Sequence, residues 1–384
     1  PTPPFLIAMI NNDNQTLTET EATRQAIRFI NTTSAHIFLT GKAGTGKTTF
    51  LKNLAKHTYK NFIVVAPTGI AALNAGGVTI HSQFLLPLGM FLPHAMAPGT
   101  YDSAMLARKH PLNSARSQVL RAIDLLVIDE VSMLRADLLD AIDYRLKAAR
   151  SNHRQSFGGV QLLMIGDLHQ LPPVVKREEA SLLKQHYDSA WFFESLALRQ
   201  QGFVYLTLDK IFRQRDDSFI DLLNHLRDNQ ITPQDIALLN TRVVAADENA
   251  HNHGAIVLTT HNYQVDALNQ KKLDALDAKL YYFKATVEGE FPSSMYPVDE
   301  RLALKVGAQI MFTKNDNETR MYFNGKLATV TAITSNSIDV QFADGGDTYT
   351  LKQHVWENKK YAYSESNQQL EDEVVGTFTQ YPVR

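Results

Sequence analysis

One stretch limits the possible folds of this chain more than any other: "AHIFLTGKAGTGKTTFLKNLAKH". Its apolar residues 37–39 predict a buried strand, the glycine-rich segment predicts a tight turn, and the remainder has the pattern of a helix. A strand, a Gly-x4-Gly-Lys-Thr turn and a helix in this order are the context in which the motif indicates phosphate binding. The sequence therefore predicts an α/β fold with a nucleotide site.

The residues of this loop have separate expected roles. Gly41, Gly44 and Gly46 let the backbone curl its N–H groups around phosphate oxygens, and the helix start adds a favourable dipole. Lys47 is expected to reach the terminal phosphates of ATP, and Thr48 to ligate Mg²⁺. A chance glycine-rich turn is the alternative, and the flanking strand and helix make it rare. The predicted nucleotide-binding residues are Gly41, Ala43, Gly44, Thr45, Gly46, Lys47, Thr48 and Thr49.

Two adjacent carboxylates follow the apolar run 125–128 in "LLVIDEVSML". Open α/β sheets bind their ligands at the carboxyl ends of their strands, which is where Asp129 and Glu130 would lie. We expect Asp129 to hold Mg²⁺ and Glu130 to orient and deprotonate the attacking water. Adjacent acidic residues alone are common on protein surfaces. After a complete phosphate loop and a buried strand, however, they predict hydrolysis of the nucleotide.

A further apolar run, residues 162–165, ends in "GDLHQLPPV". The two prolines prevent a regular continuation, so the polar residues after the strand lie at its carboxyl end. This position would bring Gln170 beside the same phosphates, where its amide can sense the γ-phosphate or orient the attacking water.

Composition excludes several other classes of protein. The 384 residues contain no cysteine, which rules out disulfides, thiolate nucleophiles and cysteine-bound zinc. No segment has the length and apolarity of a membrane span, and "FLIAMI" lacks the charge and length of a signal peptide. A cytosolic protein with no membrane partner is expected. The net charge of −2 gives no global positive field, so any nucleic-acid site must be a local groove.

The motifs "GKAGTGKT", "APTGIAAL", "GGVTIHS", "VIDEVSM", "FGGVQLLMIGDLHQLPPV" and "IFRQRDDSF" occur in the order and spacing of the PIF (petite integration frequency) helicases, relatives of the RecD and Dda helicases. The resemblance runs from about Leu17 to the C-terminus. It implies an ATP-dependent DNA helicase that moves 5′ to 3′ on single-stranded DNA and unwinds forked or structured duplex DNA. A monomer is expected, with family roles in repair, recombination, telomere maintenance and G-quadruplex unwinding. The location would be cytoplasmic in a bacterium, and nuclear or mitochondrial in a eukaryote.

The resemblance also implies a domain plan of two RecA-like P-loop NTPase domains. We expect an N-terminal tail (1–16), a first motor domain (17–200), a second motor domain (201–330), an SH3-like β-barrel insertion (331–375) and a return to the second motor domain (376–384). Residues 83–118 contain four prolines and little periodicity, which favours a small inserted wedge subdomain. From Leu302 an apolar alternation predicts strands, and Asp344-Gly345-Gly346 a hairpin turn. A plain β-meander without DNA contact is the alternative to the barrel.

By resemblance, Arg213 in "IFRQRDDSF" is an arginine finger for the γ-phosphate; an exposed arginine near a helix start is the alternative. The helical pattern after it predicts a helix with one buried face. Phe84, Phe91 and His81 could stack on DNA bases, although most aromatic residues are core residues. Asn262 is expected to contact DNA, and capping of a helix is the alternative role for its side chain. The matching positions imply these DNA contacts: Pro67, Thr68, His81, Ser82, Thr260 and Asn262.

The helical segment "RADLLDAIDYRLKAARSNHR" carries Arg145, Lys147, Arg150 and Arg154. A solvated basic face is the expected role, and a stripe that binds DNA phosphates is the alternative.

In the related helicases, "TFTQYPVR" leads into a further DNA-contacting motif and a second arginine finger, whereas this sequence ends at Arg384. We therefore expect impaired turnover, and the alternative function is a nucleotide- and DNA-binding module without productive turnover. A phosphate-loop kinase or GTPase is disfavoured because such folds do not need "GDLHQLPPV".

Overall fold

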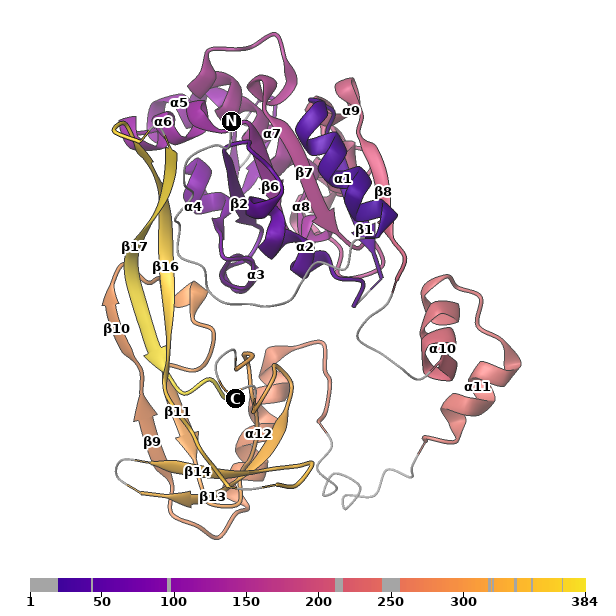
Figure 1. Ribbon diagram of the computed structural model, residues 1–384, viewed down its shortest axis with the longest axis vertical. Coiled ribbons are helices and arrows are strands. Elements are labelled where there is room, and N and C mark those ends of the chain that lie inside the picture. Colours follow the sequence, from indigo (N-terminus) through magenta and orange to yellow (C-terminus); the bar gives the residue numbers. More distant parts are fainter. Residues whose placement is uncertain are drawn as a thin grey trace, which may run out of the picture. The chain divides into compact units, whose positions relative to one another are not determined.

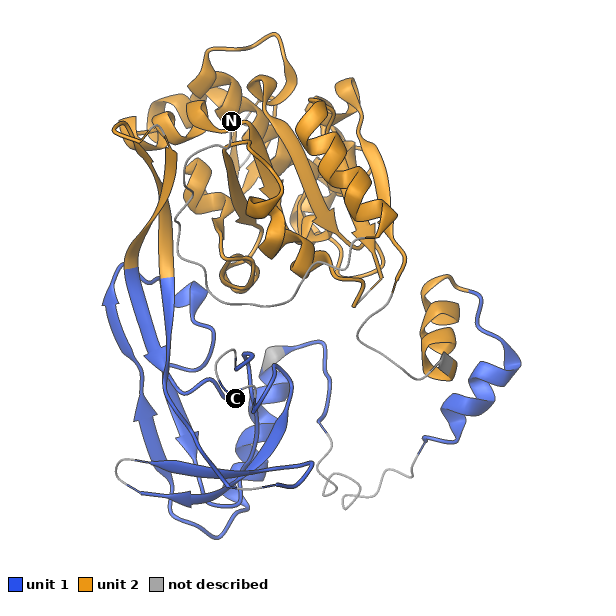
Figure 2. Ribbon diagram, in the orientation of Figure 1, with its two compact units in different colours: residues 1–14, 230–357, 376–384 blue, residues 15–229, 358–375 orange. Residues whose placement is uncertain are grey.

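The structure is a computed structural model that describes residues 20–384, except residues 43, 95–97, 211–216, 244–255, 317–318, 320, 335–336, 347 and 368. The chain divides into two compact units (Figure 2). Unit 2 consists of residues 15–229 and 358–375, and unit 1 consists of residues 1–14, 230–357 and 376–384. Within the described ranges, no helix is both long and apolar enough to cross a membrane.

Unit 2 contains a six-stranded parallel sheet with the strand order β3-β2-β6-β7-β1-β8 (Figure 1). The strands predicted at residues 37–39, 125–128 and 162–165 all belong to it. The carboxyl ends of β1, β7 and β6 are neighbours, so the segments that follow these strands share one edge of the sheet. Its strands are β1 (Ile37–Gly41), β2 (Phe62–Ala66), β3 (Val78–Thr79), β6 (Leu125–Ile128), β7 (Gln161–Gly166) and β8 (Val204–Leu208).

The sheet of unit 2 has a hydrophobic core on each face. Alternate residues of a strand point to opposite faces, so Phe38 belongs to one core, and Ile37 and Leu39 to the other. The first core includes residues of α6 and α7, and the second includes residues of α1 and α2. Helices therefore cover both faces, which explains why the strands are continuous apolar runs. The predicted α/β class is confirmed.

The other elements of unit 2 connect or cover these strands. In the described part of residues 83–118, β4 pairs in parallel with β5 and two helices follow, and Phe91, Tyr101 and Leu106 join the first core, whereas Met90 and Leu92 belong to a separate cluster. The elements are α1 (Glu21–Thr32), α2 (Lys47–Asn53), η1 (Leu54–Lys56), α3 (Gly69–Ala75), α4 (Ile80–Phe84), β4 (Met90–Phe91), β5 (Thr100–Tyr101), α5 (Ser103–Lys109), α6 (Ser114–Ala122), η2 (Val131–Met133), α7 (Ala136–Arg150), η3 (Ser156–Gly159), α8 (Arg177–Leu183), η4 (Phe192–Glu194), α9 (Leu196–Gln201) and α10 (Asp217–Arg227).

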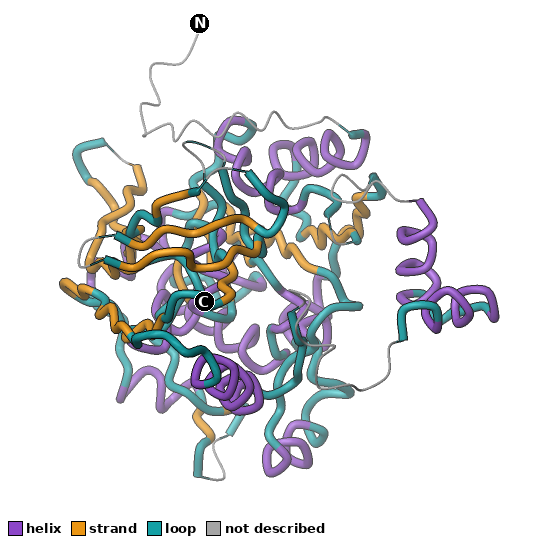
Figure 3. Tube along the Cα trace, turned by 90° about the horizontal axis from the view of Figure 1, so that it is seen from below, coloured by secondary structure: helices purple, strands orange, loops and turns teal. Residues whose placement is uncertain are grey.

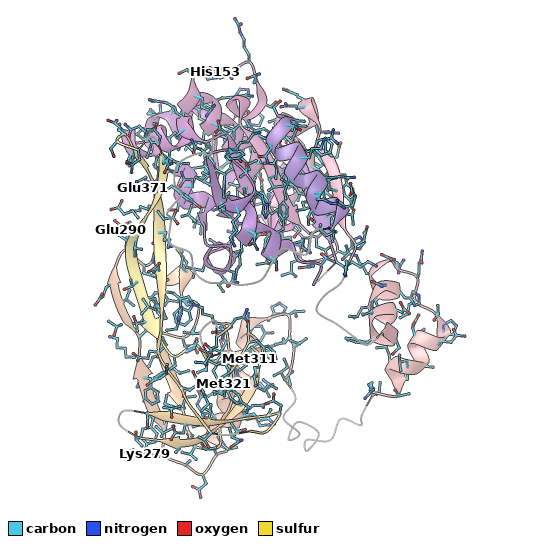
Figure 4. All side chains as sticks on the ribbon, viewed as in Figure 1. His153, Lys279, Glu290, Met311, Met321 and Glu371 are labelled. Atoms are coloured by element: carbon cyan, nitrogen blue, oxygen red, sulfur yellow. The ribbon has the colours of Figure 1, made fainter. Side chains whose placement is uncertain are left out.

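The prediction that Arg145 and Arg150 lie on a solvated basic face of α7 is wrong. Arg145 is 2% exposed, and its guanidinium donates hydrogen bonds to the carbonyl oxygens of Leu85 and His110. Its burial follows from packing of residues 83–118 over α7. Arg150 donates to four backbone carbonyl oxygens, those of Leu120, Arg121, Ile123 and Gly158. Beyond the helix, Arg154 is exposed. His153 is also exposed (Figure 4).

The predicted helix after "IFRQR" is present as α10, but its apolar face is not buried as predicted. Leu222 is buried, whereas Phe219, Leu223 and Leu226 are 40%, 42% and 46% exposed. Periodicity shows that apolar side chains share a face of a helix; it does not show that a neighbouring element covers that face.

Unit 1 is built mainly from strands (Figure 3). They form a β10-β17-β16 sheet, a β11-β9 pair and a β12-β13-β14-β15 sheet. The predicted turn is confirmed: Gly345 and Gly346 have φ values of +87° and +101° and lie between β14 and β15. The elements are α11 (Pro233–Asn240), α12 (Asn262–Asp274), β9 (Tyr281–Lys284), β10 (Thr286–Gly289), η6 (Ser293–Met295), β11 (Arg301–Leu304), β12 (Gln309–Met311), β13 (Leu327–Ile333), β14 (Ile338–Phe342), β15 (Tyr349–Thr350), β16 (His354–Ser364) and β17 (Gln369–Gln380).

Candidate active site

The phosphate-binding loop joins β1 to α2, and its glycines are required by its own geometry. A Cβ atom on Gly41 would lie 2.5 Å from Oγ1 of Thr45 and 2.7 Å from the carbonyl oxygen of Leu208. Gly44 and Gly46 have φ values of +81° and +91°, in the left-handed region that favours glycine. The chain can therefore turn directly from the strand into the helix, with the first helical N–H groups at the sheet edge.

Lys47 is the first residue of α2, and its side chain returns over the loop. Its Nζ donates to the carbonyl oxygens of Gly41, at 2.5 Å, and Lys42, at 3.1 Å. Burial lowers the pKa of Lys47, and the carboxylates of Asp167, Glu130 and Asp129 partly offset this effect. Lys47 therefore lies within electrostatic reach of the acidic residues that follow β6 and β7.

Threonine hydroxyls occupy different environments around the loop. Thr45 is 4% exposed, and its Oγ1 donates to the carbonyl oxygen of Lys42 at 2.9 Å, so this hydroxyl stabilises the turn. Thr48 is the second residue of α2 and is exposed, and Thr49 is half-buried. Ala43, also predicted to bind nucleotide, lies outside the described residues.

The two carboxylates predicted for hydrolysis follow β6 directly. The backbone N–H of Asp129 donates to the carbonyl oxygen of Val65 at 2.9 Å, which continues the pairing of β6 with β2. Burial raises the pKa of Asp129 to about 6, and the neighbouring charge of Glu130 acts in the same direction. Glu130 has φ 51° and ψ 42°, a left-handed conformation that is uncommon for a residue other than glycine. Such backbone strain is concentrated at functional sites.

The turn after β6 also packs against the end of β7. A Cβ atom on Gly166 would lie 3.0 Å from Cγ1 of Val131 and 3.1 Å from the N atom of Ser132. Glycine at this position therefore allows the segment carrying Glu130 to approach the segment carrying Asp167. Close packing against the turn after β6 therefore explains why "GDLHQ" begins with a glycine.

Asp167 is the centre of a hydrogen-bond network at the end of β7. Its side chain is 1% exposed, and its Oδ1 accepts the backbone N–H of His169 at 3.1 Å. Its Oδ2 accepts Nε2 of Gln170 at 3.1 Å and Nη1 of Arg227 at 2.6 Å. Burial acts to raise the pKa of Asp167, but these hydrogen bonds, chiefly that of Arg227, hold it below its usual value. The carboxylate is therefore ionised.

Unit 2 thus brings several predicted site residues together at the edge formed by β1, β6 and β7. Lys47 experiences the charges of Asp129, Glu130, Asp167 and Arg227, and Gln170 is bonded to Asp167. The sequence patterns gave no role to Asp167 or Arg227. Its position directly after a buried strand could have marked Asp167 as a site residue, whereas no sequence pattern marks Arg227. Arg213 lies outside the described residues.

The donor set at this edge fits Mg²⁺. Thr48 offers a hydroxyl oxygen and Asp129 a carboxylate, which are oxygen ligands of the type that Mg²⁺ prefers. In the described part of the chain, no group of three or more His, Cys, Asp and Glu side chains could hold a metal ion.

The predicted DNA contacts of unit 2 follow β2 and β3. Thr68 caps α3, with its Oγ1 accepting the N–H of Ala71 at 3.2 Å, and Pro67 precedes it. His81 and Ser82 lie in α4 and are half-buried, and burial lowers the pKa of His81. The prediction that Phe84 and Phe91 stack on DNA bases is wrong. These side chains are 0% and 8% exposed and pack in the first core of unit 2, where helices and sheet leave no room for a base.

The predicted DNA contacts of unit 1 precede α12. Thr260 is exposed, and its Oγ1 forms a 2.8 Å hydrogen bond with Nδ1 of His261. His261 occupies the N-cap position, and Asn262 is the first residue of the helix. The side chain of Asn262 lies outside the described residues.

Comparison with known proteins gives consistent matches. The family model of the PIF1-like helicases matches residues 15–236. The ATP-dependent DNA helicase PIF1 of Saccharomyces cerevisiae is 35% identical over 312 residues, which are 77% of this chain and 33% of that relative. The chain therefore spans about a third of that relative's length.

Solved structures of Bacteroides Pif1 are also similar. The crystal structure in complex with ADP-AlF4 has a TM-score of 0.83 and 36% identity, and the match covers 96% of this chain and 81% of that one. The structure bound to single-stranded DNA has a TM-score of 0.59, with the same identity and coverage. The family model covers more than half of the chain, and the chain therefore belongs to the PIF1-like helicase family.

Proposed function

We propose that the chain is an ATP-dependent DNA helicase that moves 5′ to 3′ on single-stranded DNA and unwinds duplex or structured DNA. The observation that carries the proposal is the meeting of Lys47, Asp129 and Asp167 at one sheet edge in a PIF1-like helicase. A Bacteroides relative was solved with ADP-AlF4 and with single-stranded DNA, which supports nucleotide and DNA as the ligands of this chain.

The chemistry of hydrolysis follows from the residues at this edge. Lys47 and the backbone N–H groups of the loop bind the terminal phosphates and offset their negative charge. Thr48 and Asp129 would hold Mg²⁺, which would supply further positive charge to offset the negative charge of the phosphates. Glu130 accepts a proton from the attacking water, and Gln170 orients that water or contacts the γ-phosphate. Unit 2 thus holds the groups needed for γ-phosphate cleavage.

The raised pKa of Asp129 suits a site that is completed by a cation. Burial and the neighbouring charge of Glu130 make Asp129 costly to ionise, and a bound divalent cation would offset this cost. Binding of the magnesium complex of ATP therefore favours ionised Asp129 and leaves Glu130 available as the base.

The remaining roles concern DNA and the coupling of hydrolysis to movement. Arg213 is proposed as the arginine finger and residues 83–118 as the wedge that splits the duplex. The proposed motor domains are residues 17–200 and 201–330, with residues 331–375 as an SH3-like insertion. Hydroxyl, imidazole and amide groups suit DNA backbone contacts that do not depend on sequence. The proposed DNA contacts are Pro67, Thr68, His81, Ser82, Thr260 and Asn262.

Forked DNA is the proposed substrate, with support from a similar solved structure that describes DNA unwinding at forked double-stranded DNA by two coordinating Pif1 helicases. Two helicases act together in that structure, so the monomeric state of this chain stays a prediction. Its cellular location also stays a prediction.

A strand-displacement assay tests direction and function together. Two partial duplexes that differ only in having a 5′ or a 3′ single-stranded tail are mixed with the 384-residue chain and the magnesium complex of ATP. The proposal expects displacement only from the 5′-tailed duplex, and none with Glu130→Gln, which lacks the base. Displacement from the 3′-tailed duplex would contradict the direction. Binding of ATP and DNA with no displacement or turnover would favour the binding-module alternative.

A further inference from the structure

The last residue of α10, Arg227, reaches into the nucleotide site of unit 2. Its Nη1 lies 2.6 Å from Oδ2 of Asp167, and the exposed fractions of the two side chains are 20% and 1%. Its backbone carbonyl oxygen also forms a 3.1 Å hydrogen bond with Nδ1 of His169. One residue of α10 is thus bound, through its side chain and its backbone, to the loop that carries Gln170.

The same carboxylate decides how the Gln170 amide is turned. An ionised carboxylate only accepts hydrogen bonds, so the group of Gln170 that lies 3.1 Å from Oδ2 of Asp167 is its NH₂ end. The carbonyl oxygen Oε1 is then the end of the amide that is not held by Asp167. A carbonyl oxygen can accept a hydrogen from the attacking water, which is the property that a water-orienting amide needs.

This arrangement depends on the charge of Arg227. Asp167 is almost fully buried, and burial favours its protonated form. Without the guanidinium, a protonated Asp167 could donate to Oε1 of Gln170, and the amide would turn its NH₂ end toward the nucleotide. Arg227 also lowers the pKa of Lys47, against the effect of Asp167, so it offsets the negative charge that Asp167 places beside the phosphate-binding lysine.

We propose that Arg227 is a positioning residue for the γ-phosphate. It keeps Asp167 as a carboxylate that only accepts hydrogen bonds, and Asp167 in turn fixes the orientation of the Gln170 amide. The inference rests on the proposed function, because the role of Gln170 belongs to it. It also connects the end of α10 with the group expected to distinguish ATP from ADP.

The alternative is that the ion pair between Arg227 and Asp167 only holds α10 against the rest of unit 2. A fastening role predicts that loss of Arg227 lowers the stability of the fold but affects ATP and ADP binding equally. A positioning role predicts a selective loss for the triphosphate, because Gln170 contacts only the γ-phosphate or the water beside it. The two roles are therefore separable by the ratio of two affinities.

The test compares the affinities of the full chain for ATPγS and ADP, measured by competition with a fluorescent ADP analogue in the presence of Mg²⁺. The variants are Arg227→Ala, Arg227→Lys, Gln170→Ala and the Arg227→Ala/Gln170→Ala double variant. Arg199→Ala is the matched control, because Arg199 forms an exposed pair of 2.9 Å with Asp188 in the same unit.

For Arg227→Ala we expect the ATPγS affinity to fall about tenfold while the ADP affinity stays within about twofold. Arg227→Lys, which keeps the positive charge, should recover most of the loss. The double variant should lose no more than Gln170→Ala alone, because both changes remove one interaction. Arg199→Ala should leave both affinities unchanged.

Equal losses for ATPγS and ADP, or effects of Arg227→Ala and Gln170→Ala that multiply, would overturn the inference. Should Arg227→Ala fail to fold, Asp167→Asn decides: it should lower the ATPγS affinity while the ADP affinity stays within about twofold, and equal losses for the two nucleotides would refute the inference. Because binding is measured without turnover, the outcome is separate from that of the proposed function. Absence of DNA-stimulated hydrolysis in the unaltered chain would count against the function alone.

Discussion

The backbone N–H of Val64 donates a 3.0 Å hydrogen bond to the hydroxyl of Tyr361, nearly 300 residues away in the sequence. Val64 lies in β2, and β3 pairs only with Val65 and Ala66 on that strand. The hydroxyl of Tyr361, in the part of β16 that belongs to unit 2, also lies 3.4 Å from the carbonyl oxygen of Val64. Residues 358–375 therefore contribute to the edge of the parallel sheet as well as to the hydrophobic core beside it.

Tyr361→Phe should destabilise unit 2 by about 1–2 kcal/mol, because the buried N–H of Val64 would lose its partner while the ring is kept. Urea unfolding of the full chain measures this change. Tyr59→Phe is the matched control, since Tyr59 is 91% exposed, and it should change the free energy of unfolding by less than about 0.5 kcal/mol. Equal effects of the two substitutions would show that the hydroxyl of Tyr361 contributes nothing.

Asp129→Asn should stabilise the nucleotide-free protein at pH 8 while it abolishes hydrolysis. The pKa of Asp129 is raised to about 6 in the fold, so its charged form destabilises the protein above that pH, and this penalty decreases as the pH falls and the carboxyl takes up a proton. The gain of the variant should be about 2 kcal/mol at pH 8 and clearly smaller at pH 5.

Urea unfolding without Mg²⁺ at the two pH values checks the Asp129 prediction. Asp188→Asn, which removes an exposed carboxylate of the same unit, is the control and should have little effect at either pH. A stabilisation that grows as the pH falls would have the wrong sign for a carboxyl with a raised pKa.

Arg150→Ala should destabilise unit 2 by about 2–4 kcal/mol, because four backbone carbonyl oxygens lose a charged donor. Arg150→Lys should recover only part of this loss, since an ammonium group cannot reproduce the fork of a guanidinium. Arg154→Ala removes an exposed arginine four residues later and should be near neutral. If instead Arg150→Ala weakened DNA binding with unchanged stability, α7 would carry the DNA-phosphate stripe after all.

The sequence was sufficient for the features that depend on local signals. The glycine-rich turn between an apolar strand and a helix predicted the position of Lys47, and polar residues after buried strands predicted those of Asp129 and Gln170. Each motif could be placed without knowledge of long-range contacts because strand ends of a parallel sheet meet at one edge, and the roles of the three residues stay predictions.

The features that the sequence did not predict depend on contacts between distant segments. Arg145 reads as a solvated residue of a helix, and it is buried because Leu85, 60 residues earlier, presents its carbonyl oxygen to it. Arg227 is also 60 residues from Asp167, and no motif marks it. In both cases the partners are carbonyl or carboxylate oxygens of residues distant in the sequence, which leave no periodic pattern.

In the proposed function, the edge formed by β1, β6 and β7 hydrolyses ATP to drive movement on DNA. Steady-state ATP hydrolysis by the 384-residue chain, with and without a single-stranded oligonucleotide, tests this proposal beside Lys47→Ala. We expect strong stimulation by DNA and a loss of about 10³-fold in the variant, because Lys47 offsets charge on the transferred phosphate. Hydrolysis that is unaffected by DNA, or that persists in Lys47→Ala, would contradict it.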